Sequence, residues 1–162
     1  MAVLAVLVGL HVARQFLPAD LDDWLVLTLA FIPARFATGM AAELPGGAWA
    51  AWTSFVTHMT VHADATHLMF NSAWLLAFGG AIGLRAGGAR FLAFAVVTGI
   101  CGALAFLAFN PNLLAPVIGA SGAVAGLMGG TMRFLFAGLD MGGVRALSEH
   151  PTEIPLMSLA AT

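Results

Sequence analysis

Residues 117–139 read VIGASGAVAGLMGGTMRFLFAGL, and this stretch decides the fold class. It is apolar and rich in glycine, and its length is close to the ~20 residues that an α-helix needs to cross a bilayer. Near its start, Ser121 stands between Ala120 and Gly122. Polar side chains at membrane depth are costly and mark functional sites by default, so Ser121 is a candidate site residue.

The composition of the whole chain points the same way. The 162 residues are 60% hydrophobic and only 9% charged, whereas a soluble domain carries roughly 25% charged residues. The net charge of −2 gives no reason to expect nucleic acid as a partner. A single cysteine, Cys101, excludes an internal disulfide. We therefore expect an all-α membrane protein whose first partner is the lipid bilayer.

Four stretches are apolar and long enough to be predicted as membrane-crossing helices: residues 1–17, 66–84, 91–109 and 117–139. We interpret residues 1–162 as one polytopic helical bundle, and residues 140–162 as a cytoplasmic loop or tail. Residues 18–57 are predicted to form a long outer loop that lies partly in the membrane interface, where tryptophans favour the headgroup level. Its tryptophans are Trp24, Trp49 and Trp52.

The arginines predict the orientation of the chain. Arg85 and Arg90 lie between the second and third spans, and Arg133 and Arg145 lie at and beyond the end of the fourth. Basic loops stay in the cytoplasm, so both termini are predicted to be cytoplasmic. The second and fourth spans then both start from the outer side. This places five polar residues towards the same outer face: His58, His62, His67, Asn71 and Ser121.

Ser121 has the surroundings that a nucleophile needs. At the first turn of a helix, free N–H groups and the helix dipole stabilise negative charge, including the oxyanion that forms when a serine attacks a carbonyl. His67 and Asn71 are four residues apart and share one helical face, and both can donate hydrogen bonds. Each signal also has an ordinary structural explanation, since polar side chains and the spacing Gly122, Gly126, Gly130 commonly serve helix packing.

The pattern His58-x-x-x-His62-x-x-x-x-His67-x-x-x-Asn71 followed by Gly119-Ala-Ser121-Gly122 resembles the rhomboid intramembrane serine proteases, over roughly residues 52–130. The resemblance implies a six-helix bundle of which about four helices are present. It implies Ser121 as nucleophile and His67 and Asn71 as oxyanion donors beside the Ser121 N–H. It assigns structural positions near the site to His58, His62, Gly119 and Gly122.

The resemblance further implies that the chain cleaves transmembrane protein substrates and needs no cofactor or metal. It gives no oligomeric state. We expect an integral, multi-pass protein of the bacterial inner (cytoplasmic) membrane.

Three features depart from the family pattern. The general base of the family is a histidine on the sixth helix, and the chain shows no such span; its last histidine, His150, lies in a polar stretch. Ala125 stands where the family often has an aromatic residue. Trp52-Thr53 stands near the position of a Trp-Arg pair. The chain is either a piece of a longer reading frame, which we favour, or a relative that has lost activity. In both cases we expect little or no proteolysis from residues 1–162 alone.

Other functions stay open. A non-catalytic rhomboid-like protein could bind transmembrane clients without using Ser121. A metal or haem site would use His58 and His62, four residues apart, but no cysteine or second carboxylate completes a cluster. A transporter is the least favoured class, since the spans contain no paired acidic residues.

Overall fold

The computed structural model describes residues 2–37 and 40–138. Within these residues the chain is helical apart from turns and one isolated pair of bridged residues, Phe31 and Val117. The elements are α1 (Ala2–Arg14), α2 (Ala19–Leu29), α3 (Ala34–Ala37), η1 (Met40–Ala42), α4 (Gly47–Thr57), η2 (His58–Thr60), α5 (Ala65–Trp74), the π-helical η3 (Leu75–Gly79), α6 (Gly80–Ala86), α7 (Gly88–Phe109) and α8 (Ser121–Gly138). The all-α fold class is confirmed. The tail predicted at 140–162 lies outside the described residues.

Two helices are long and apolar enough to cross a membrane: the continuous run α5–η3–α6 (Ala65–Ala86) and α7 (Gly88–Phe109), each of 22 residues. They correspond to the predicted spans 66–84 and 91–109. Only 11% of the most apolar window of α7 is buried inside the structure. An apolar helix that is this exposed would be unfavourable in water, which supports a lipid environment for α7.

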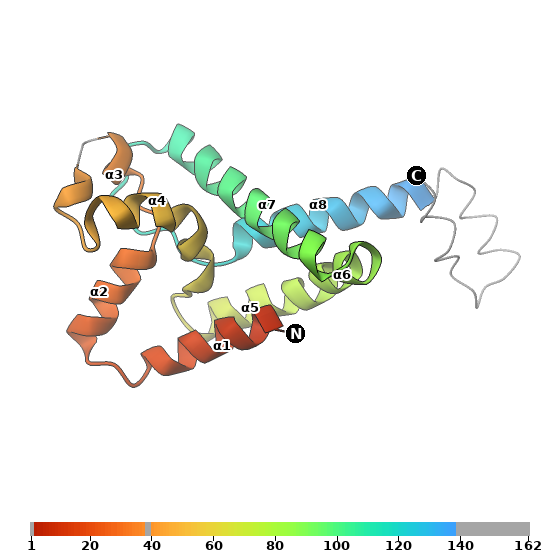
Figure 1. Cartoon of the computed structure of the whole chain (residues 1–162), viewed down its shortest axis with the longest axis horizontal. Coiled ribbons are helices and arrows are strands. Elements are labelled where there is room, and N and C mark those ends of the chain that lie inside the picture. Colours follow the sequence, from red (N-terminus) through yellow and green to blue (C-terminus); the bar gives the residue numbers. More distant parts are fainter. Residues whose placement is uncertain (1, 38–39, 139–162) are drawn as a thin grey trace, which may run out of the picture. The chain divides into compact units, whose positions relative to one another are not determined.

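The two other predicted spans are shorter than expected. α1 has 13 residues, which spans only about 20 Å at the rise of an α-helix, and Pro18 follows shortly after its end. α8 begins at Ser121 rather than at Val117, because Val117 pairs with Phe31 in extended backbone. α1 lies alongside α5 (Figure 1), and the start of α8 contacts α7 at Gly122 and Gly126. Four crossings in total therefore stay a prediction.

The stretch predicted as a long outer loop, residues 18–57, is built mostly of the short helices α2, α3 and α4 (Figure 1). Phe31 is fully buried, and its ring packs against those of Phe36 and Phe55. Trp24, Trp49 and Trp52 are each more than half exposed. That the stretch lies outside the membrane stays a prediction.

Arg35 ties this helical stretch together. It is only 2% exposed, and its guanidinium donates to the carbonyl oxygens of Leu27 (2.9 Å), Pro45 (2.8 Å) and Gly47 (3.3 Å). One planar cation thereby satisfies a carbonyl of the last turn of α2 and two at the start of α4. Backbone carbonyls buried without such donors would destabilise the fold.

The crossing of α7 and α8 explains the glycines of α8. A Cβ atom on Gly122 would lie 3.6 Å from the Cα of Gly99, and one on Gly126 would overlap the side chain of Thr98. The glycine face of the fourth span thus already has a close helical partner, α7. For Gly122 and Gly126, this is the packing role that the glycine spacing indicated.

Candidate functional site

The turn that leads into Ser121 is held at three points by residues far away in the sequence. Phe31 and Val117 exchange both backbone hydrogen bonds (3.0 and 2.8 Å). The Gly119 N–H donates to the His58 carbonyl at 2.9 Å. The Ala120 N–H donates to Nε2 of His62 at 3.4 Å. Three of the four residues before the helix, Val117, Gly119 and Ala120, are therefore held in place. The position of Ser121 is thus set by the fold and not by the turn alone.

The absence of a side chain at Gly119 lets the predicted oxyanion donors, His67 and Asn71, approach this turn. Its φ of +108° lies in the left-handed region, which favours glycine. A Cβ atom at this position would lie 2.6 Å from Nε2 of His67 and 3.7 Å from Nδ2 of Asn71. Both side-chain nitrogens thus converge on one point above Gly119, two residues before Ser121.

His67 and Asn71 are positioned by the start of α5. Asp64 is the N-cap, and its carboxylate accepts the His67 backbone N–H at 2.8 Å. Asn71 lies one turn later, is buried, and donates from Nδ2 to the His67 carbonyl at 3.0 Å. A carboxamide nitrogen carries two protons, so the second proton of Asn71 stays available to a ligand.

Ser121 is the first residue of α8 and is exposed. The first α-helical bond runs from Val124 N to Ala120 O at 2.9 Å. The N–H groups of residues 121–123 therefore have no partner within the helix. Within the described part of the chain the Ser121 hydroxyl makes no hydrogen bond. The site presents a free hydroxyl next to free backbone donors.

The contact with α7 sets the depth of Ser121. Gly122 lies against Gly99 and Gly102, seven to ten residues before the end of α7 at Phe109. At the rise of an α-helix this is about 10–15 Å along the α7 axis. Ser121 therefore begins its helix well inside the length of an apolar span.

His62 and His58 both stay neutral at physiological pH. His62 is completely buried, and this burial, together with the charges of His67, His11 and Arg14, lowers its pKa to about 4. His58 is also buried, which lowers its pKa, and its Nδ1–H donates to the Ser54 carbonyl at 2.7 Å. Neutral imidazoles can accept hydrogen bonds, and His62 does so from the Ala120 N–H.

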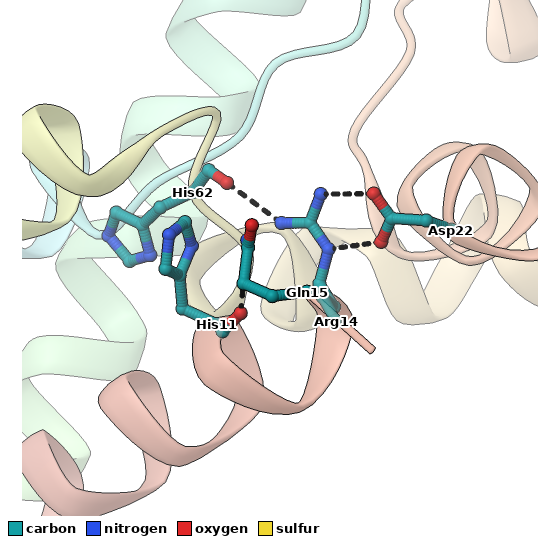
Figure 2. Close-up of polar contacts among 5 residues, drawn as sticks. All are labelled: His11, Arg14, Gln15, Asp22 and His62. Atoms are coloured by element: carbon teal, nitrogen blue, oxygen red, sulfur yellow. Dashed lines mark hydrogen bonds and ion pairs between the residues drawn. The ribbon is translucent and has the colours of Figure 1, made fainter. Parts of the chain in front are cut away.

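Sequence reasoning missed the role of Arg14. No role was assigned to Arg14 from the sequence, but its side chain is buried and only 8% exposed. Its Nε and Nη2 donate to the two carboxylate oxygens of Asp22 (2.6 and 3.0 Å), and its Nη1 donates to the His62 carbonyl at 2.8 Å (Figure 2). The available signal was an acidic residue in the first turn of the next helix. Arg14 therefore fixes the backbone of His62, whose ring accepts the Ala120 N–H.

The geometry of His58 and His62 differs from the one that the metal interpretation needs. His58 lies in η2 and His62 in the extended segment after it, so the two do not share a helix face as the metal interpretation required. Among the described residues there is no group of three histidine, cysteine or acidic side chains that could hold a metal ion.

Comparison with known proteins places this chain in a family. The family model for the Rhomboid domain matches residues 49–144, more than half of the chain. The chain is 36% identical over 78 residues to the "Rhomboid protease GluP" of Bacillus subtilis strain 168, and 38% identical over 78 residues to the "Putative rhomboid protease YdcA" of the same strain. Each match covers 48% of this chain, 15% of GluP and 39% of YdcA. No solved structure gives a significant match.

The chain belongs to the rhomboid family, as the sequence predicted. It spans well under half the length of both relatives. Membership, together with the exposed apolar helices, makes it an integral membrane protein of a family whose relatives are named as proteases.

Proposed function

We propose that the chain forms part of an intramembrane serine endopeptidase, with Ser121 as the nucleophile and His67 and Asn71 as oxyanion donors. Its substrates are transmembrane proteins, cleaved within or near the bilayer. The supporting observation is the convergence of His67 Nε2 and Asn71 Nδ2 on one point above Gly119, directly before the helix that begins with Ser121.

The chemistry follows from these groups. Ser121 Oγ attacks the peptide carbonyl carbon and gives its proton to a general base. Negative charge develops on the carbonyl oxygen, and the donors for it are the Ser121 N–H, the second Nδ2 proton of Asn71 and the His67 ring. The tetrahedral intermediate collapses, the amine leaves with a proton from the base, and water then hydrolyses the serine ester.

The general base comes from outside the described residues. Within residues 2–37 and 40–138 the histidines have other positions: His58 and His62 hold the turn, His67 faces Gly119, and His11 lies beside His62. His150, the fifth, lies outside the described residues. Because His150 stands in the polar stretch Ser148-Glu149-His150-Pro151, we do not assign it as the base, and we expect residues 1–162 alone to cleave little or nothing.

The depth of Ser121 along α7 supports cleavage inside the membrane rather than above it. Arg85 lies at the far end of the 22-residue helix that starts beside His67. If basic loops mark the cytoplasmic side, the site opens on the outer side of a bacterial inner membrane. A substrate helix then reaches Ser121 where its outer end enters the bilayer.

The test is cleavage of a single-span reporter protein, co-expressed with the protein from its natural reading frame. Ser121→Ala removes only the hydroxyl and is expected to abolish cleavage. Ser72→Ala is the matched control, because its buried hydroxyl has no hydrogen-bond partner among the described residues, and it is expected to cleave normally. If Ser121→Ala cleaves like the wild type, the protease assignment is wrong. If no variant cleaves but the reporter stays bound, the chain is the non-catalytic, client-binding relative.

A further inference from the structure

Two buried histidine nitrogens near the site lack partners. His11, on α1, is 9% exposed, and His62 is 0% exposed. The Nδ1 atoms of both rings are buried without a hydrogen bond in the described structure. Figure 2 shows the two rings next to each other, and the two side chains are close enough to interact electrostatically. Buried polar atoms normally have a partner, and a buried water molecule is a common one.

The contact with Ala120 determines where the proton of His62 must be. Nε2 accepts the Ala120 N–H, so Nε2 cannot carry a proton itself. Because the ring is neutral, its single proton is on Nδ1. The buried Nδ1–H of His62 therefore needs a hydrogen-bond acceptor. The buried Nδ1 of His11 can serve as that acceptor when it carries no proton.

We propose that His11 is a positioning residue for the Ser121 turn: its Nδ1 accepts, through one buried water molecule, the Nδ1 proton of His62. The water accepts from His62 and donates to His11, and this holds His62 in the tautomer whose Nε2 binds Ala120. The N-terminal helix α1 thereby orients the turn before the nucleophile. This inference rests on the proposed function for its purpose, but not for its geometry.

The other groups around His62 do not replace His11. Arg14 is a cation that only donates hydrogen bonds, and it is already bonded to Asp22 and to the His62 carbonyl. The His67 ring meets His62 edge-on, with ring centroids 5.1 Å apart. The Thr60 carbonyl lies close enough to favour the protonated ring, but it makes no hydrogen bond with Nδ1. Thr60 is the rival acceptor that an experiment has to exclude.

The test reads the tautomer directly. Residues 1–162 are labelled with ¹⁵N-histidine and ¹⁵N-alanine and studied by NMR in lipid nanodiscs at pH 7. The His62 signals are assigned by their loss in His62→Gln, and the Ala120 amide by its loss in Ala120→Ser. In the wild type we expect the proton on Nδ1. In His11→Leu, which keeps bulk but removes the acceptor, we expect a mixture of tautomers and about 10-fold faster hydrogen exchange of the Ala120 amide, the effect of losing one hydrogen bond.

His11→Gln supplies an amide oxygen as acceptor and is expected to restore both signals. Val12→Ala, an exposed change on the same helix, is the control and should alter neither. The proposal is overturned if wild-type His62 carries its proton on Nε2, or if His11→Leu keeps tautomer and exchange unchanged, which would assign the role to Thr60. Neither readout needs proteolysis, so a failure of the Ser121 chemistry would leave this result standing.

Discussion

Nε2 of His67 lies 2.6 Å from the point that a Cβ atom on Gly119 would occupy. No side chain fits between this turn and the first turn of α5. The glycine therefore does more than allow a positive φ, because it lets a neighbouring helix bring a ring nitrogen against the backbone just before Ser121.

Gly119→Ala is predicted to reduce cleavage of a transmembrane reporter by about 100-fold, the typical effect of losing one oxyanion donor. The added methyl group would overlap His67 and would strain a backbone with φ +108°. Gly80→Ala is the control, since a Cβ at Gly80 meets nothing within 4 Å. Equal activity of the two variants would show that His67 is not needed at this position.

The pH dependence of stability should carry the signature of His62. The pKa of His62 falls from 6.5 to about 4 in the folded protein. Below pH 6.5 His62 binds a proton in the unfolded chain, whereas in the folded protein it binds one only at about pH 4. The contribution of His62 to the free energy of unfolding is therefore fully present above pH 6.5. It falls by roughly 3 kcal/mol between pH 6.5 and 4. The lowered pKa of His58 acts in the same direction.

The measurement is the midpoint of thermal unfolding in detergent between pH 7.5 and 4. His62→Gln keeps an acceptor for Ala120 without a titrating group, so its curve should be flatter over this range. A curve for His62→Gln that is as steep as the wild type would contradict the assignment.

Arg14 and Asp22 are predicted to stabilise the protein as a coupled pair. Arg14 is buried and Asp22 is partly exposed, and the Arg14 hydrogen bond holds the pKa of the Asp22 carboxyl below its usual value. A double-mutant cycle of Arg14→Ala and Asp22→Ala, measured by unfolding, should give a coupling of about 1–3 kcal/mol. Arg14→Ala should cost more than Asp22→Ala because it also frees the His62 carbonyl. Additive effects would mean that the pair contributes no coupling.

The crossing of α7 and α8 gives a packing prediction. A Cβ on Gly126 would come within 2.3–2.4 Å of three atoms of the Thr98 side chain. Gly126→Ala should therefore destabilise the protein by about 1–3 kcal/mol, although alanine favours helix. Gly9→Ala in α1, where a Cβ meets nothing within 4 Å, should be neutral or stabilising. A neutral Gly126→Ala would mean that the helices separate easily.

The sequence was sufficient for those features that depend on local pattern. Apolar length predicted the helices at 65–86 and 88–109. The residues of the recognised motif, from His58 to Gly122, meet around one turn. Their catalytic roles stay a prediction. These features could be found because membrane helices have a strong compositional signal and because the motif has fixed spacing.

The missed features depend on contacts between residues far apart. Arg14 and Arg35 are buried by folding, and each finds backbone carbonyls that no local pattern reveals. His11 interrupts an apolar stretch and gives no sign in the sequence of its place beside His62. The helices of residues 18–57 were hidden because their apolar runs are short and are broken by proline and glycine.

The central claim is that the Ser121 hydroxyl is the attacking group. A fluorophosphonate probe forms a covalent bond with an activated serine, and mass spectrometry of the labelled protein, made from its natural reading frame, identifies the modified residue. We predict an adduct on Ser121 that disappears in Ser121→Ala and persists in Ser72→Ala. Cleavage of the reporter with no adduct on Ser121, or with the adduct on another serine, would contradict the account.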